Sequence, residues 1–131
     1  MQVRDNRYIR EEALPAWPWR RRAAWTAIDE DAGLVPTPLP QGAMARAAAA
    51  GAAALDAAIH AWDIAEATGQ GSPLTPELAR ALTPVAQSIV EPLRQYGAYA
   101  QALDPQPWAG AGTDPAAVLL CYLGRRPDWR A

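Results

Sequence analysis

The longest stretch of the chain with a helical pattern runs from Ala43 to Gly69 and consists largely of alanine. In its second half, larger apolar side chains recur three and four residues apart, at Leu55, Ile59 and Trp62. Residues at these spacings lie on one face of an α-helix. The pattern therefore predicts a long helix whose apolar face packs against a core.

A second helix is predicted to begin after Thr75, because Thr75 can cap the first turn and Pro76 suits the first helical position. Its apolar positions recur three and four residues apart and define a core face: Leu78, Leu82, Val85, Ile89 and Leu93. Pro84 lies inside this pattern, so we expect a kink there, or a break into two short helices. A last helix is predicted from Ala116 to Leu123, with Gly124 ending it.

No segment shows the alternation of apolar and polar residues that is typical of strands, so the chain is predicted to be all-α. Residues 34–40 contain three prolines and are expected to form a rigid, extended connector. With 131 residues, the chain can form one domain with one modest core. We expect a shortened bundle of about four helices, in which a divergent segment (1–34) precedes the main helical region (35–131). Small residues around Gly51 allow a second helix to approach closely, and a homodimer could complete the bundle in this way.

The charges of the chain are nearly balanced, with a formal net charge of -2 and arginine as the only strongly basic residue type. Such a balance gives no argument for a nucleic-acid partner. No apolar run is long enough to cross a membrane, and the polar N-terminus does not resemble a signal sequence. The single cysteine, Cys121, lies among apolar residues and is expected to be a core residue. A cytoplasmic protein is the resulting expectation.

Three tryptophans, Trp17, Trp19 and Trp25, surround an arginine triplet at residues 20–22. One interpretation is an aromatic and cationic wall for an anionic or aromatic ligand. The other is a helix whose tryptophans fill the core while its arginines face water. Binding to nucleic acid is a weaker interpretation, because the acidic residues 29–31 follow directly.

Asp56, His60 and Asp63 fall within roughly 60° of one another around the predicted central helix, since each residue advances about 100°. One interpretation is acid–base chemistry, in which Asp56 orients one ring nitrogen of His60 and the other nitrogen transfers a proton. A second is a metal site, because a carboxylate and an imidazole four residues apart can bind one ion. The third is a structural histidine with a hydrogen-bonded neighbour.

The same helix carries a resemblance to a known family. The segments DAAIHAWDIAEATGQ (56–70), SPLTPELARAL (72–82) and DPAAVLLCYLGRRPDW (114–129) resemble the C-terminal half of the DinB-like superfamily. Within it, they are most similar to actinobacterial proteins related to mycothiol-dependent maleylpyruvate isomerase. The resemblance begins at Val35 and implies a DinB-like helical bundle.

In that family, an acidic residue and the histidine four positions later are two of three ligands to a divalent metal. The resemblance therefore implies that Asp56 and His60 bind Zn or Ni. The third family ligand is a histidine of the N-terminal half, and this chain has only one histidine. Asp63, a residue such as Glu11 or Glu12, or a second subunit could complete the site, or the metal is absent. The resemblance also implies mycothiol as a co-substrate.

These observations predict an enzyme that acts on a small organic substrate by metal-assisted or acid–base isomerisation or transfer, in a bacterial biosynthetic pathway. The expected catalytic residues are Asp56, His60 and Asp63. The residues expected to bind the substrate are aromatic: Trp62, Trp17, Trp19, Trp25 and Tyr96. Tyr99 and Tyr122 could, like Tyr96, donate to a substrate oxygen, and the sequence does not rank the three. The alternative is a non-catalytic helical module that binds a ligand or a second bundle and has lost the metal.

Overall fold

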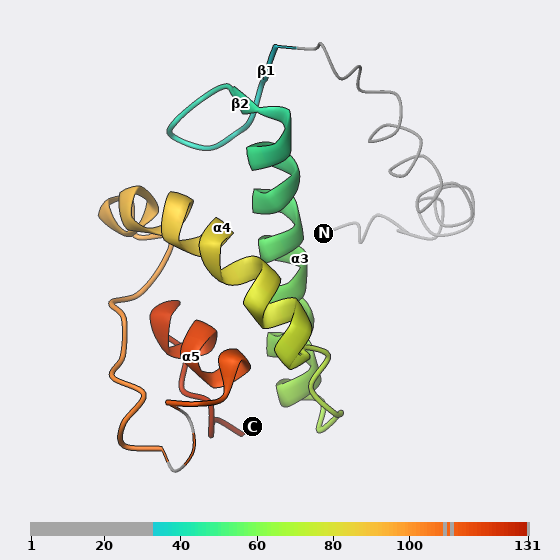
Figure 1. Ribbon diagram of the computed structural model, residues 1–131, viewed down its shortest axis with the longest axis vertical. Helices are drawn as coiled ribbons and strands as arrows, with labels where there is room; N and C mark the ends of the chain where they lie inside the picture. The colour runs from blue at the N-terminus through green and yellow to red at the C-terminus, as the bar shows by residue number, and fades with distance from the viewer. Residues whose placement is uncertain (1–32, 109, 111, 131) are drawn as a thin grey trace, which may run out of the picture. The chain divides into compact units, whose positions relative to one another are not determined.

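The computed structural model describes residues 33–108, 110 and 112–130, which are mostly helical (Figure 1). Its elements are listed in chain order: β1 (Leu34–Val35), β2 (Met44–Ala45), α3 (Arg46–Ala67), α4 (Pro76–Gln95) and α5 (Pro115–Tyr122). The described residues therefore confirm a helical class and contain three helices. The fourth helix that the sequence predicts, together with Glu11, Glu12, Trp17, Trp19 and Trp25, lies outside the described residues.

β1 lies in the segment that was expected to be extended, whereas β2 lies within the stretch predicted to be helical, so α3 begins at Arg46 and not at Ala43. The pairing of the two strands was not predicted from the sequence. β1 pairs antiparallel with β2, in a register that places Leu34 opposite Ala45 and Val35 opposite Met44. The Thr37 hydroxyl donates a hydrogen bond to the Gly42 carbonyl and closes the proline-rich loop between the strands. Strands of two residues are too short to produce an alternating pattern, which explains why the sequence did not reveal them.

The apolar face of α3 is buried as predicted, with Leu55, Ile59 and Trp62 between 0% and 4% exposed. Gly51 lies on the same helix, where it faces α4. A Cβ atom added at Gly51 would lie 3.1 Å from both γ-carbons of Val85. The small residue thus lets α3 and α4 approach closely within one chain, which gives the expected tight helix pair without a second subunit.

α4 begins as predicted, because the Thr75 hydroxyl accepts a hydrogen bond from the Leu78 amide at 3.2 Å. Of the kink or break expected at Pro84, the break does not occur, because the helix continues through both Pro84 and Pro92. Both prolines are exposed, so the carbonyls that lose their amide partners, at Arg80 and Ser88, belong to turns that water can reach. The packing of the opposite face keeps the helix continuous.

The buried face of α4 is formed by both small and large apolar side chains: Ala79, Leu82, Ala86, Ile89, Val90 and Leu93. Leu78 was predicted to be part of this face but is 38% exposed. The prediction was wrong because it counted only large side chains. Ala79 and Ala86 complete the face and allow close packing.

α5 packs on α4 and ends near the C-terminal end of α3 (Figure 1). The Asp114 carboxylate caps its first turn by accepting a hydrogen bond from the Ala116 amide at 3.0 Å. Gly124 follows the helix with a φ of 79°, as expected for its end. Cys121 is buried, and burial raises the pKa of its thiol, which agrees with a core residue. No helix in the described residues is long and apolar enough to cross a membrane.

Candidate functional site

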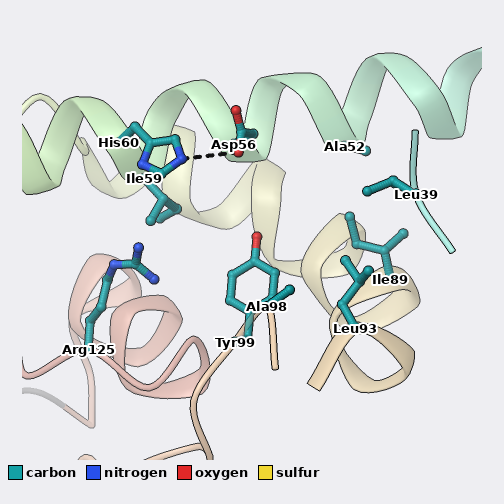
Figure 2. A pocket seen from close by; sticks show the side chains of 10 residues that line it. All are labelled: Leu39, Ala52, Asp56, Ile59, His60, Ile89, Leu93, Ala98, Tyr99 and Arg125. Carbon is teal, nitrogen blue, oxygen red and sulfur yellow. Dashed lines mark ion pairs between the residues drawn. The ribbon is translucent and has the colours of Figure 1, made fainter. Parts of the chain in front are cut away.

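A cavity of about 190 Å³ opens between α3, the C-terminal part of α4 and the segments that follow α4 and α5 (Figure 2). Six of its lining residues are apolar: Leu39, Ala52, Ile59, Ile89, Leu93 and Ala98. Four carry functional groups: Asp56, His60, Tyr99 and Arg125. A concave, mostly apolar surface with a few polar groups is the usual form of a small-molecule site.

His60 lies between two carboxylates of its own helix. Its Nε2 atom is 3.3 Å from Asp56 Oδ1, and its Nδ1 atom is 3.7 Å from Asp63 Oδ2. The three residues therefore share one face of α3, as the sequence predicted. The side chain of His60 is 65% exposed, while Ile59 beside it is buried. The imidazole is thus held at the mouth of the cavity and remains accessible to a ligand.

Asp63 is bound by Arg125, which follows α5. The guanidinium donates from Nε to Asp63 Oδ1 at 2.9 Å and from Nη2 to Asp63 Oδ2 at 2.8 Å. These hydrogen bonds lower the pKa of Asp63 against the opposing effect of partial burial. They also raise the pKa of Arg125. Asp63 thus stays ionised beside the imidazole, and its position depends on the contact between α3 and the end of α5.

Tyr99 lies on the loop after α4 and points its hydroxyl toward α3 (Figure 2). Burial raises the pKa of the phenol, Asp56 adds to this effect, and Arg125 and Arg94 oppose it. The hydroxyl is therefore a hydrogen-bond donor at neutral pH, and within the described part of the chain no side chain or carbonyl accepts from it. Tyr96, which the sequence analysis placed at the site, is 70% exposed and is not among the residues that line this cavity.

The loop that carries Tyr99 is fixed by Arg94, whose side chain is only 6% exposed. Its guanidinium donates hydrogen bonds to the carbonyls of Ala100 and Tyr122. Its Nε atom donates to Glu91 at 3.1 Å, and its charge lies 5.1 Å from the centre of the Tyr122 ring. Arg94 therefore connects α4, the Tyr99 loop and the end of α5.

Trp62 is 4% exposed and belongs to the core. It also lines a second, more open cavity of about 480 Å³, together with Asp63, Arg125, Trp129 and two neighbouring residues. Arg125 lines both cavities. The Arg125 side chain, which Asp63 binds, thus separates the second cavity from the one that contains His60.

Asp56 and His60 are close enough to act on one ligand, but in the described part of the chain no group of three His, Cys, Asp or Glu side chains is arranged to hold a metal ion. Asp63 does not complete such a group, because it faces the other ring nitrogen and both its oxygens bind Arg125. A catalytic zinc site needs three protein ligands. The described residues alone therefore do not fit a complete metal site.

Comparisons with known proteins provide no relative, since no family model, curated protein or solved structure matches the chain. The resemblance to DinB-like proteins stays a prediction from the motif.

Arg125 was not identified from the sequence as a site residue, and Tyr99 was only one of three tyrosines, with Tyr96 and Tyr122, that the sequence offered without ranking as donors to a substrate oxygen. Arg125 belongs to a tail in which Arg126 follows directly, and nothing in that spacing distinguishes the two arginines. Tyr99 is one of several tyrosines after or near α4, and only the fold shows which of them faces the cavity. Both residues reach the site through contacts between segments distant in the sequence.

Proposed function

We propose that the chain is a small-molecule enzyme in which His60 transfers a proton to or from a substrate bound in the cavity beside it. The observation that carries this proposal is the position of the His60 imidazole between Asp56 and Asp63, at the mouth of a mostly apolar cavity. A relationship to the DinB-like superfamily, and with it an isomerase or transferase reaction, is part of the same proposal.

The two carboxylates have different roles in this proposal. Asp56 Oδ1 lies 3.3 Å from Nε2 of His60 and stabilises the imidazolium that forms when the ring takes up a proton. Nδ1 is 3.7 Å from Asp63, beyond hydrogen-bond distance, and is the nitrogen that transfers the proton. Asp63 is held by Arg125 and keeps the opposite side of the ring in a negative environment. The imidazole can therefore alternate between its neutral and charged forms while its orientation is maintained.

A metal-assisted reaction is a second candidate, favoured by the carboxylate and imidazole at positions 56 and 60. Its third ligand would have to come from residues outside the described part or from a second copy of the chain. Use of a thiol such as mycothiol also stays a prediction from the resemblance. The competing class is a non-catalytic module that binds a ligand in the same cavity.

The test is to incubate the protein with a panel of small ketones, esters, alkenoic acids and alcohols in deuterated buffer and to follow the compounds by proton NMR. We expect at least one compound to be converted or to exchange a C–H proton. His60→Gln should slow this reaction about 100-fold or more, since acid–base catalysis contributes on this order. Glu77→Gln, on an exposed residue of α4, is the control. Binding without conversion would favour the non-catalytic module instead.

The same samples distinguish the metal-assisted reaction from acid–base catalysis by His60 without a metal. Protein treated with EDTA should keep its full rate if His60 acts without a metal. Restoration of a lost rate by Zn²⁺ or Ni²⁺, together with loss of metal binding in Asp56→Ala, would support the metal-assisted reaction.

A further inference from the structure

The cavity contains two hydrogen-bond donors that face the side on which His60 lies, and we infer that they hold the carbonyl oxygen of the substrate. The substrate class is then a small carbonyl compound with a C–H bond next to its carbonyl group. This inference rests on the proposed function, because it requires His60 to act as the base that removes the proton.

The first donor is Arg125. Its Nε and Nη2 atoms bind Asp63, and Nη1 has no acceptor among the described residues. The second donor is the hydroxyl of Tyr99, which likewise makes no hydrogen bond within the described part. Figure 2 shows both side chains directed from below toward α3, where His60 and Asp56 lie. Both donors reach solvent, since no buried side-chain nitrogen or oxygen of the described residues lacks a partner. A ligand that brings an acceptor oxygen into the cavity would receive a hydrogen bond from each of them.

The charges around the cavity favour a carbonyl over a strongly anionic group. Asp56 and Asp63 carry two negative charges on α3, and Arg125 carries one fixed positive charge. Two carboxylates beside one guanidinium disfavour a ligand with several negative charges. A neutral carbonyl oxygen accepts from both donors and does not add a charge in the ground state.

The proposed reaction uses the base on one side of the cavity and the two donors on the other. His60 takes the proton from the carbon next to the carbonyl, and the electron pair of that C–H bond forms a C=C bond to the carbonyl carbon. The π electrons of the carbonyl move to its oxygen, where Tyr99 and Arg125 donate to the developing negative charge. If the substrate has a C=C bond beyond that carbon, return of the proton from the imidazolium to the far end of the dienolate moves the double bond next to the carbonyl. If the imidazolium first exchanges its proton with solvent, return to the same carbon replaces the C–H proton by a solvent proton. The cycle needs no oxidant or further reactant.

The size and lining of the cavity limit the rest of the substrate. Its volume of about 190 Å³ is below the range of about 300–1,000 Å³ that drug-sized ligands occupy. Leu39, Ile89 and Leu93 form its apolar wall. The substrate therefore has a short apolar body attached to the carbonyl group.

Butanone, 2-oxobutanoate and cyclohex-3-enone are suitable probes, because proton NMR in deuterated buffer detects exchange of the C–H protons in all three and movement of the double bond in cyclohex-3-enone. We expect the protein to accelerate exchange or isomerisation of at least one probe. Tyr99→Phe should slow this reaction at least about tenfold, since loss of one donor to a developing oxyanion costs that much or more. Tyr122→Phe is the matched control, because it removes a hydroxyl that binds Glu91 and does not line the cavity.

Arg125→Lys is a second variant, since lysine keeps the charge but cannot bind Asp63 with two nitrogens and donate to a substrate with a third. It should also slow the reaction, and a thermal melt shows whether it folds. An unchanged rate in Tyr99→Phe would overturn the inference. Conversion of alcohols alone, or hydrolysis of esters without exchange of a C–H proton, dependent on His60, would overturn it while leaving the proposed function intact. Absence of any reaction with carbonyl and other compounds would overturn both.

Discussion

Arg125 and Asp63 are 62 positions apart in the sequence and are joined by two hydrogen bonds of 2.9 and 2.8 Å. The paired geometry connects α3 to the end of α5 and places the guanidinium at the wall of the cavity. Because the carboxylate is also 3.7 Å from His60 Nδ1, one ion pair links the packing of the helices to the environment of the imidazole.

The first prediction concerns the pH dependence of stability. The pKa of Asp63 is lowered from 3.8 by Arg125, so the pair stabilises the folded state fully above the unfolded pKa. This contribution is lost as the pH falls below about 4 and through the lower native pKa. We expect the free energy of unfolding of the wild type to fall more steeply between pH 5 and pH 3 than that of Asp63→Asn.

Urea denaturation at several pH values measures this difference. Glu77→Gln, which removes an exposed carboxylate of α4, should retain the wild-type dependence. Parallel curves for the wild type and Asp63→Asn would contradict the prediction.

The second prediction concerns the contact between Gly51 and Val85. Gly51→Leu should destabilise the protein by about 1–3 kcal/mol, because an added side chain meets Val85 at a distance that is already close for one Cβ atom. Thermal or chemical denaturation measures the change. Ala53→Leu is the control, since it adds a similar volume at an exposed position of the same helix.

A double variant tests whether Val85 is the cause. Val85→Ala should recover part of the stability that Gly51→Leu loses, because it provides space for the leucine. Equal losses in Gly51→Leu and Ala53→Leu would instead show that the helix pair is not close at this point.

The third prediction concerns Arg94, which positions the Tyr99 loop. Arg94→Met should lower stability by about 1.5–3 kcal/mol, because it removes hydrogen bonds from a charged and buried donor to two backbone carbonyls. Arg80→Met is the control, since Arg80 is exposed and its pair with Glu77 is 3.7 Å long.

The role of Arg94 as a positioning residue has a separate readout. If Arg94 acts on the reaction only through Tyr99, Arg94→Met should slow exchange of the carbonyl probes in the wild type and have little further effect in Tyr99→Phe. Additive losses in the double variant would mean that Arg94 affects the site by another route.

Local sequence signals identified the parts of the fold that depend on a single helix. The stripe of Asp56, His60 and Asp63 follows from helical pitch, and the cap at Thr75 follows from the chemistry of one turn. The error at Leu78 arose because small residues such as Ala79 carry no periodic signal, although they are fully buried. The break expected at Pro84 did not occur, because packing of the opposite face outweighs the loss of one hydrogen bond.

The two hydrogen-bond donors of the site could not be selected from the sequence for a different reason. Arg125 and Tyr99 reach the cavity only after α4 and α5 pack on the core, and their positions depend on contacts over long distances in the sequence. A pattern within one helix could therefore identify the proposed base, whereas it did not indicate Arg125 and could not select Tyr99 among the tyrosines.

The base lies on α3, whereas the two donors follow α4 and α5. The distance between the base and the donors is therefore set by the interfaces between the helices, and not by any one segment. A conservative change in the shared interior, such as Leu119→Val, could move α5 slightly and alter turnover while the protein stays folded. Residues that never touch a ligand would then tune this site.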